Sequence, residues 1–435
     1  MLSVLQNRTY RHLFLAQVIA LIGTGLATVA LGLLAYDLAG ANAGAVLGTA
    51  LAIKMIAYVG VAPVAAAFAE RLPRRTMLVT LDLIRAAVAL ALPFVTEVWQ
   101  VYVLIFVLQS ASAGFTPTFQ ATIPDVLPDE KEYTRALSLS RLAYDLESVI
   151  SPMLAAALLT VISFHSLFAG TVVGFLISAA LVVLVSLPSP KATAPRGIYD
   201  RTTRGLRIYL ATPRLRGLLA LNLAVAAASA MVIVNTVVLV QAGFGLSQRA
   251  TALALAAFGG GSMVAALLLP RLLDDVPDRR AMLAGASVLV AGLFVGATVP
   301  AYGFLLPLWF VLGLGYSLAQ TPSGRLLRRS SQPEDRPALF AAQFALSHAC
   351  WLITYPVAGW LGAKAGLSVT FVALGILALL AVMLAARVWP DHDPEEIDHE
   401  HDELEPDHPH LAGGGHRHRH AYVIDGDHTE WPRSI

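Results

Sequence analysis

The sequence predicts an all-α polytopic membrane protein with twelve transmembrane helices in two pseudo-symmetric halves of six, followed by a disordered C-terminal tail. Three observations support this fold class: long apolar runs, alternating placement of basic residues between those runs, and an internal repeat. The composition agrees with it. Hydrophobic residues make up 57% of the chain and charged residues only 14%, whereas soluble domains carry about 25% charged residues.

The apolar runs are long enough to cross a bilayer, because about 20 helical residues span its hydrocarbon core of about 30 Å. Breaks at proline and at polar or charged residues divide the chain into twelve segments. The expected spans are residues 12–38, 43–69, 76–96, 98–122, 134–162, 165–187, 215–242, 248–273, 281–300, 303–326, 337–363 and 367–388. The basic N-terminal segment precedes a long first span without a small-residue cleavage site, so we expect a retained helix rather than a signal peptide.

Basic residues test this count, because short cytoplasmic loops collect Lys and Arg. The odd-numbered connections offer only Arg249 and Lys364. The even-numbered connections and their edges hold Arg71, Arg74, Arg75, Lys131, Arg135, Lys191, Arg196, Arg201, Arg204, Arg207, Arg214, Arg271, Arg279, Arg280, Arg325, Arg328, Arg329 and Arg336. The alternation predicts that both termini are cytoplasmic. Since Arg greatly outnumbers Lys, as in GC-rich bacterial genomes, the expected location is a bacterial inner membrane.

The two halves resemble each other in sequence. Three short motifs recur at nearly the same offset: Pro73-Arg74-Arg75 with Pro277-Asp278-Arg279-Arg280, Thr116-Pro117-Thr118 with Thr321-Pro322-Ser323, and Ser151-Pro152 with Tyr355-Pro356. The repeat predicts an N-terminal half (1–187), a cytoplasmic linker (188–214), a C-terminal half (215–388) and a tail (389–435). Two parallel six-helix repeats are typical of transporters that rock around a site between their halves.

One loop motif identifies a family. Ala66-x-x-x-Glu70-Arg71-x-Pro73-Arg74-Arg75 is similar to the loop 2–3 signature of the major facilitator superfamily, Gly-x-x-x-Asp-Arg-x-Gly-Arg-Arg. Ala66, Glu70 and Pro73 depart from the pattern, whereas the acidic character and all three basic positions are kept. The resemblance covers about residues 10–388. It implies the fold of that superfamily and a gating role for Glu70, Arg71, Arg74 and Arg75.

The fifth span carries charges at membrane depth, where each costs about 2.5–3.5 kcal/mol on insertion scales and usually faces a cavity. Its polar face covers about 160° of the helix and comprises Ser140, Arg141, Tyr144, Asp145, Glu147, Ser148, Ser151 and Pro152. Arg141 and Asp145 are expected to pair at i,i+4. Glu147 has no obvious local cation, so it is a candidate proton carrier or cation ligand. The alternative is that both acids belong to a structural network with Arg141 and Arg85.

Other spans add candidate site residues. In the eleventh span His348 shares a stripe with Phe344, Trp351 and Tyr355, and the repeat places this span opposite the fifth. His348 could contact a metal substrate or be a packed, hydrogen-bonded core histidine. Lys54, in the second span, is another charge at membrane depth. We therefore assign proton or cation coupling to Asp145, Glu147, Arg141 and Lys54. The predicted substrate pathway comprises His348, Tyr144, Trp351 and Tyr355, and Asp82 with Arg85 is expected to brace the motif loop.

The tail holds nine of the 12 histidines. Interleaved imidazoles and carboxylates suit late first-row metal ions, and the predicted ligands are His399, His401, His408, His410, His416, His418 and His420. Their spacing predicts several weak, exchanging sites rather than one closed site. A purification tag, a solvated tail with incidental histidines, and a pH-responsive segment are the alternatives.

A facilitator with a His-rich cytoplasmic tail resembles the nickel-resistance branch of the superfamily. That resemblance implies proton-coupled export of nickel, with cobalt as a further candidate, and zinc is a further candidate only as a bound ion. A drug, macrolide or siderophore exporter whose tail buffers or senses metal is the alternative, and a non-transporting membrane sensor is a third class. The chain shows no phosphate-binding loop or hydrolase triad, so no enzyme and no cofactor is expected. The expected partners are metal ions, protons and the bilayer but no nucleic acid, and the expected state is a monomer.

Overall fold

The computed structural model describes residues 2–39, 43–69, 72–188, 197–394, 396–400, 411, 417–425, 427–428 and 430–432. Several residues named in the prediction lie outside this part of the chain. They are Glu70 and Arg71 of the motif loop, Lys191 and Arg196 of the linker, and the tail histidines His401, His408, His410 and His416.

The first half begins with a short 3-10 helix, Leu2–Gln6, and contains six long helices. They are α1 (Arg8–Ala39), α2 (Ala43–Ala69), α3 (Arg74–Ala91), α4 (Val98–Val126), α5 (Glu130–Leu158) and α6 (Phe164–Val183). A 3-10 turn, Leu92–Phe94, extends α3. The side chain of Asp129 accepts a hydrogen bond from the backbone N–H of Glu132, 2.8 Å away, and this cap fixes the start of α5.

A linker helix, α7 (Ile198–Ala211), leads to the second half. Its helices are α8 (Pro213–Val237), α9 (Gln248–Asp275), α10 (Asp278–Gly296), α11 (Tyr302–Gln320), α12 (Ser323–Arg329), α13 (Arg336–Ala365) and α14 (Leu367–Val388). A π-helical turn, Val238–Gly243, extends α8, and α12 continues the span begun by α11.

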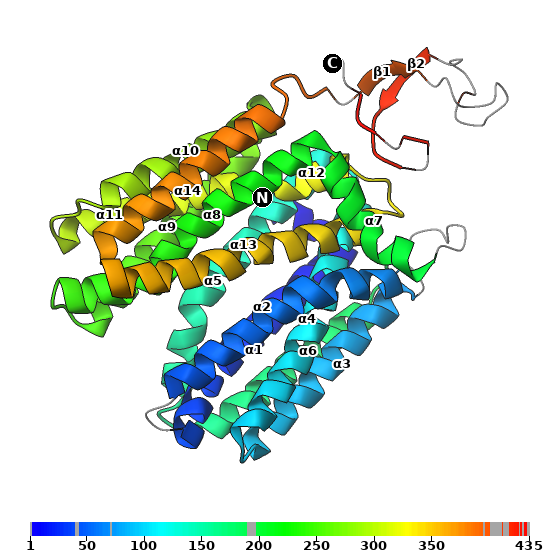
Figure 1. Ribbon diagram of the computed structural model, residues 1–435. Coiled ribbons are helices and arrows are strands. Elements are labelled where there is room, and N and C mark those ends of the chain that lie inside the picture. Colours follow the sequence, from blue (N-terminus) through cyan, green and yellow to red (C-terminus); the bar gives the residue numbers. More distant parts are fainter. Residues whose placement is uncertain are drawn as a thin grey trace.

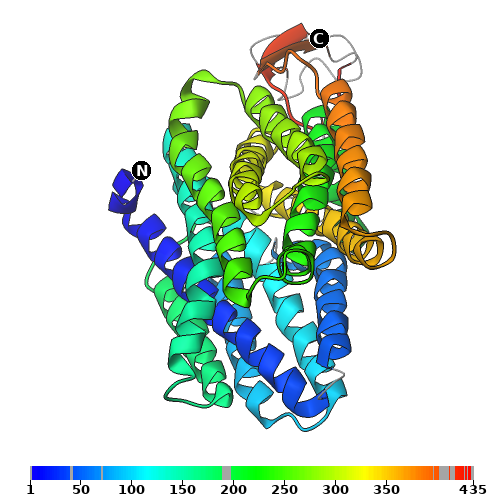
Figure 2. The ribbon, with the colours of Figure 1, turned by 90° about the vertical axis from the view of Figure 1, so that its left-hand side faces the viewer.

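The predicted fold class is confirmed. Within the described residues, 11 helices are long and apolar enough to cross a membrane. The twelfth expected span is α5, whose 29 residues include the charged face that the sequence predicts. Figures 1 and 2 show two helical bundles side by side, and α2 packs on α13 and α5 on α9 where the bundles meet.

Close helix contacts depend on glycine at particular positions. Gly261 of α9 and Gly313 of α11 lie where these helices cross, and a β-carbon at Gly261 would overlap the carbonyl of Phe310. A β-carbon at Gly313 would overlap the carbonyl of Phe258 in the same way. Because small residues allow backbones to approach closely within a membrane, these two glycines bring α9 and α11 together.

Both ends of the chain lie at the same end of the molecule (Figure 2). Near the N-terminus, Ser3 accepts a hydrogen bond of 3.2 Å from Arg135 in the second turn of α5. Beyond α14, the tail packs against Arg214 at the start of α8. We call this end of the molecule the basic end, because the arginines Arg74, Arg204, Arg325 and Arg336 gather there.

The tail is more ordered, in its described residues, than its composition predicts. Strand β1 (Glu396–Glu400) pairs antiparallel with β2 (Arg417–Ala421). Ile397, Tyr422 and Ile424 are buried and belong to the same apolar cluster as α8 and α14. These few apolar side chains cannot form a core alone, but they are stable here because the helices of the second half supply the rest of that core.

Candidate functional site

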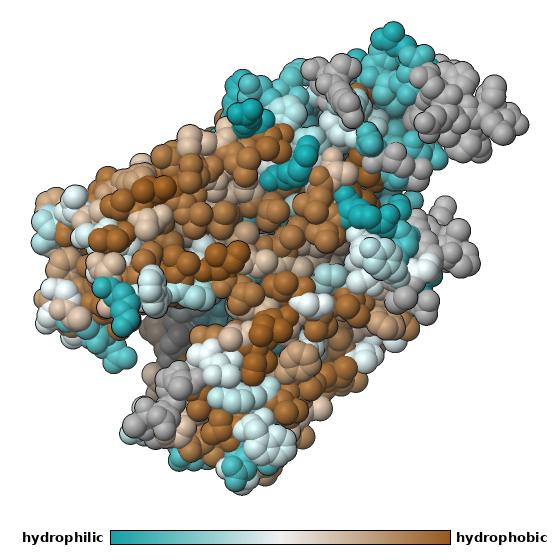
Figure 3. All heavy atoms as spheres, viewed as in Figure 1, coloured by the Kyte–Doolittle hydropathy of each residue, from teal (hydrophilic) through white to brown (hydrophobic). Residues whose placement is uncertain are grey.

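A cavity of about 560 Å³ lies between the two halves. Its walls come from α1, α2, α3, α4 and α5 of the first half and from α11, α12 and α13 of the second. The space-filling view shows the surface hollowed between the halves, away from the tail (Figure 3). A site enclosed by both repeats suits alternating access, because rocking of the halves can expose it to either side.

The polar face of α5 lines this cavity. Arg141, Tyr144 and Glu147 face it, whereas Asp145 is only 4% exposed and lies behind Arg141. Arg141 Nε donates a hydrogen bond of 3.0 Å to Asp145, as the i,i+4 spacing predicts. Arg141 Nη1 donates another of 3.2 Å to the hydroxyl of Tyr316 on α11, so this guanidinium joins the two halves.

Glu147 and Lys54 bring opposite charges into the same cavity. Both side chains line it, and Lys54 of α2 is close enough to act electrostatically on Glu147. A β-carbon at Gly25 of α1 would lie 2.6 Å from Oε1 of Glu147, so the carboxylate is held closely against that helix. Glu147 therefore interacts with Lys54, whereas Arg141 pairs with Asp145 and Arg85 with Asp82.

His348 lies among aromatic rings where α2 meets α13. Its ring centroid is 4.7 Å from that of Tyr58 and 4.2 Å from that of Phe344. Nδ1 lies 2.7 Å from the carbonyl oxygen of Phe344, which assigns the proton to Nδ1. Lys54 Nζ lies 5.5 Å from the centroid of the Tyr58 ring. His348 thus combines the packing of a core histidine with a place in the cavity wall, beside Trp351 and Tyr355.

The prediction that Asp82 and Arg85 brace the motif loop is wrong. Arg85 lies between two aromatic rings, 3.9 Å from the centroid of Phe115 and 4.5 Å from that of Phe175. It pairs with Asp82, which also accepts a hydrogen bond of 2.8 Å from Ser178. The spacing of three residues predicts the pair itself, but the pair lies inside the helix bundle and reaches the cavity wall.

Ion pairs close the cavity at the basic end. Asp125, near the end of α4, bridges two arginines: Arg74 of the motif loop at 2.5 Å, and Arg336 at the start of α13. Arg325 of α12 pairs with Glu130 of α5 and donates a hydrogen bond of 3.0 Å to Thr134. Each set crosses from one half to the other, so the halves are locked together at this end.

Three of the predicted tail ligands come together. His399, His418 and His420 each offer a ring nitrogen, and these nitrogens lie within 4.8 Å of one another. Burial and the neighbouring imidazoles lower the pKa of His399, which keeps it in the neutral, metal-binding form near pH 7. Within the described residues, no comparable group of His, Cys or acidic side chains occurs in the central cavity.

A model of the Major Facilitator Superfamily matches residues 13–235 and again residues 218–420, one match for each half. The chain belongs to this superfamily. Members of this family and fold are typically transporters rather than enzymes, and the many apolar helices identify a multi-pass membrane protein.

Other transporters of the Major Facilitator Superfamily match parts of the sequence. An uncharacterized MFS-type transporter, YfiS of Bacillus subtilis (strain 168), is 30% identical over 126 residues, covering 29% of this chain and 30% of its own. Macrolide efflux protein A of Enterococcus faecalis is 26% identical over 152 residues, covering 33% of this chain and 47% of its own. The chain spans less than half of the length of these curated relatives.

Solved structures of the superfamily share the fold along most of the chain. The human organic anion transporter MFSD10 (TETRAN) superposes with a TM-score of 0.77 at 14% identity, over 87% of this chain and 99% of its own. The fucose:proton symporter FucP of E. coli gives a TM-score of 0.70 at 14% identity, over 88% and 98%. At such low identity the likeness shows the fold alone.

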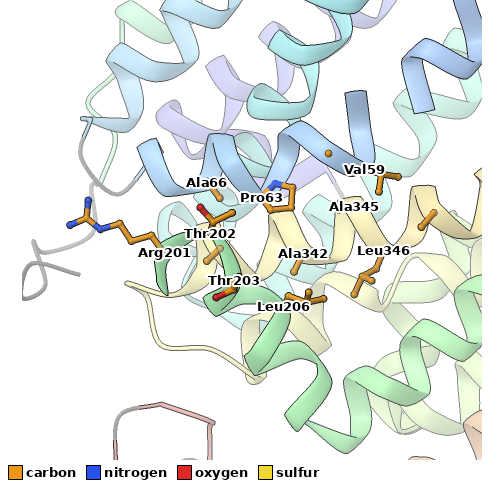
Figure 4. Close-up of a pocket in the computed structure, with 13 residues that line it drawn as sticks. Val59, Pro63, Ala66, Arg201, Thr202, Thr203, Leu206, Ala342, Ala345 and Leu346 are labelled. Atoms are coloured by element: carbon orange, nitrogen blue, oxygen red, sulfur yellow. The ribbon is translucent and has the colours of Figure 1, made fainter. Parts of the chain in front are cut away.

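A second cavity of the transporter, of about 330 Å³, lies where the linker helix α7 meets α2 and α13. Figure 4 shows small apolar side chains such as Pro63, Ala342 and Ala345 around it, with Arg201 extending away. It brings together no acid, histidine or thiol. The central cavity, with its charged face, is therefore the better candidate for the transport site.

Proposed function

We propose that this transporter exports divalent metal cations, with nickel as the main cargo and cobalt as a further candidate, by proton antiport and alternating access. The observation that carries the proposal is the group of three tail imidazoles at the basic end, joined to a transporter body with a charged central cavity. Imidazole is a ligand suited to nickel and zinc. A histidine-rich segment at the entry side would raise the local metal concentration there.

The orientation follows from the charges of the loops. With the basic end in the cytoplasm of a bacterium, the positive-inside rule is obeyed and both termini are cytoplasmic. The structure is closed at that end by the Asp125 bridge, so the cavity faces outward. We expect a monomer in the inner membrane, because each chain carries both halves that form the cavity.

Each cavity residue then has a role. Glu147 exchanges a proton against the metal ion, and Lys54 neutralises the carboxylate when neither is bound. Arg141, paired with Asp145, links the coupling site to the second half through Tyr316. His348, Tyr144, Trp351 and Tyr355 line the substrate pathway. Arg74 and Arg75, with Glu70 and Arg71, form the gate of the motif loop.

A drug, macrolide or siderophore exporter is the second candidate. The observation in its favour is the volume of the cavity, about 560 Å³, together with aromatic side chains such as Tyr58, Phe344 and Trp351 in its wall. Pockets of about 300–1,000 Å³ lined by aromatic side chains are typical for organic ligands. The names of the macrolide efflux relatives point the same way.

The decisive measurement compares the metal content of a metal-sensitive bacterium expressing the full chain with that of an empty-vector control. The full chain is expected to lower cellular nickel, and cobalt to a smaller extent, with zinc measured in the same samples. A chain ending at Pro390 is expected to export more slowly at low nickel and equally fast at saturating nickel, since the tail only raises local concentration. Unchanged metal content together with reduced macrolide accumulation would reject metal export in favour of the second candidate.

A further inference from the structure

The tail hairpin sorts its side chains onto two faces. In the register of β1 and β2, His399 lies opposite His418 and Ile397 opposite His420. Because side chains alternate across a strand, these four share one face. The arginines between the histidines lie on the other face, where Arg417 pairs with Asp398 at 2.8 Å and Arg419 with Glu396 at 3.4 Å. The alternating sequence thus keeps cations away from the imidazole face.

A fourth histidine, from outside the hairpin, lies beside one member of this group. Nε2 of His428 lies 3.1 Å from Nε2 of His399, and the His428 ring centroid is 5.1 Å from that of His420. Two imidazole nitrogens on one tetrahedral ion, at metal–nitrogen distances of about 2.0–2.1 Å, are separated by about 3.3 Å. The pair His399–His428 is therefore already at the spacing of two ligands on one ion.

Outer contacts orient these rings. Nδ1 of His399 lies 2.9 Å from the carbonyl oxygen of Ile397, and Nδ1 of His420 lies 2.9 Å from that of Ala421. Nδ1 of His428 lies 2.9 Å from Oδ1 of Asp425, which also accepts the backbone N–H groups of Asp427 and His428. Metal-binding histidines characteristically hold their second nitrogen in this way, and the contact fixes the ring and makes Nε2 the ligand atom.

The hairpin is fixed to the body of the transporter. Arg214, at the start of α8, lies 3.3 Å from Asp393, donates a hydrogen bond of 3.4 Å to the carbonyl of Tyr422, and faces the Trp431 ring at 4.9 Å. Arg329 of α12 binds the same Asp393 at 2.6 Å. Tyr422 packs edge-on against His399 and His428. The imidazole group therefore lies against the protein surface rather than on a free tether.

We infer that His399, His418, His420 and His428 form one closed, resident site for a late first-row metal ion such as Ni²⁺ or Zn²⁺, and that the bound ion fastens the tail to the C-terminal half. This adds one closed site to the several weak, exchanging sites that the spacing alone predicts, and the other tail histidines keep the concentrating role. The identity of the bound metal rests on the proposed function, because the transported ion is the one expected to reach this site. Its test measures binding and docking, so transport can fail while the site stands, and the reverse.

The test uses the full-length chain, purified in detergent without a histidine tag and stripped with a chelator. Calorimetric titration with Ni²⁺ and then Zn²⁺ is expected to show one tight site per chain. Asp425→Asn keeps the oxygen acceptor but removes the charge behind His428, and it is expected to weaken binding about tenfold to a hundredfold, the usual effect of losing an outer contact. His428→Asn is expected to weaken it at least as much.

His392→Asn is the matched control, because His392 is an exposed histidine of the same tail; it should leave the tight site unchanged. Hydrogen exchange of residues 417–424 provides a second measurement that does not depend on the variants, and the metal is expected to slow it. Two results would overturn the inference. One is several equivalent weak sites whose affinity is unchanged in His428→Asn, and the other is a hydrogen-exchange rate of residues 417–424 that the metal leaves unchanged.

Discussion

Replacing Glu147 with glutamine is expected to stop coupled export while leaving the folded transporter in the membrane. Glutamine keeps the size and the hydrogen-bonding oxygen of the side chain, but it can neither carry a proton nor balance Lys54. Since intramembrane carboxylates serve as proton relays in transporters, we expect initial export rates at least about tenfold lower. The measurement is proton-driven transport into inverted vesicles, with the protein amount matched.

The control for Glu147→Gln lies on the same helix. Glu132→Gln alters an acid in the first turn of α5, outside the central cavity, and should leave transport near the level of the unmodified chain. The double variant Glu147→Gln with Lys54→Gln tests the electrostatic pairing, because coupled residues give non-additive effects. Proton-coupled transport that persists at full rate in Glu147→Gln would exclude Glu147 as the coupling acid.

The helix period explains why Glu147 could be found from the sequence alone. Polar residues recurring along one face of α5 are visible without any tertiary information, and the structure turns Arg141, Tyr144 and Glu147 of that face toward the cavity. The spacing of four residues likewise predicted the Arg141–Asp145 pair. The helix period is therefore sufficient to predict side-chain positions and pairs within a single helix.

Contacts between the halves could not be predicted in the same way. Arg141 meets Tyr316 from 175 residues away, and Arg336 meets Asp125 from 211 residues away. Nothing near either residue in sequence specifies the partner, because the relative position of two packed bundles decides it. For the same reason Lys54 could not be assigned to Glu147.

The tail sequence contains a β-strand signal that conflicts with its composition. Alternation of His and Arg over residues 416–420 has the period of a β-strand. Low apolar content argued for disorder instead, because the hairpin lacks a core of its own. Ile397, Tyr422 and Ile424 complete their core on the helices of the second half, which a local reading of composition cannot reveal.

Replacing Asp125 with asparagine is expected to open the basic end of the transporter. Asp125 binds Arg74 of one half and Arg336 of the other. In the variant both arginines face a neutral amide in place of the carboxylate. Removing one partner of a buried ion pair costs about 3–5 kcal/mol. The cost falls on the closed arrangement, where Arg74 is 1% exposed, so the equilibrium shifts toward the state open at the basic end.

Thiol accessibility measures that shift. A cysteine at Ser112, which lines the central cavity, is placed in a Cys350→Ala background and labelled in inverted vesicles with a membrane-impermeant reagent. A loss of about 3 kcal/mol changes the ratio of the two states by about two orders of magnitude, so labelling from the basic end should become much faster. Metal or drug export should fall, because the outward-facing state is then rarely populated.

Asp274→Asn is the matched control at the same end of the molecule. Asp274 also faces a cation of the other half, Lys131 at 3.8 Å, but both side chains are largely exposed. Exposed pairs contribute about 0–1 kcal/mol, so this variant should label as slowly as the parent. Equal labelling of the Asp125 and Asp274 variants would mean that the closure depends on helix packing between α2 and α13 rather than on the charge that Asp125 places between two arginines.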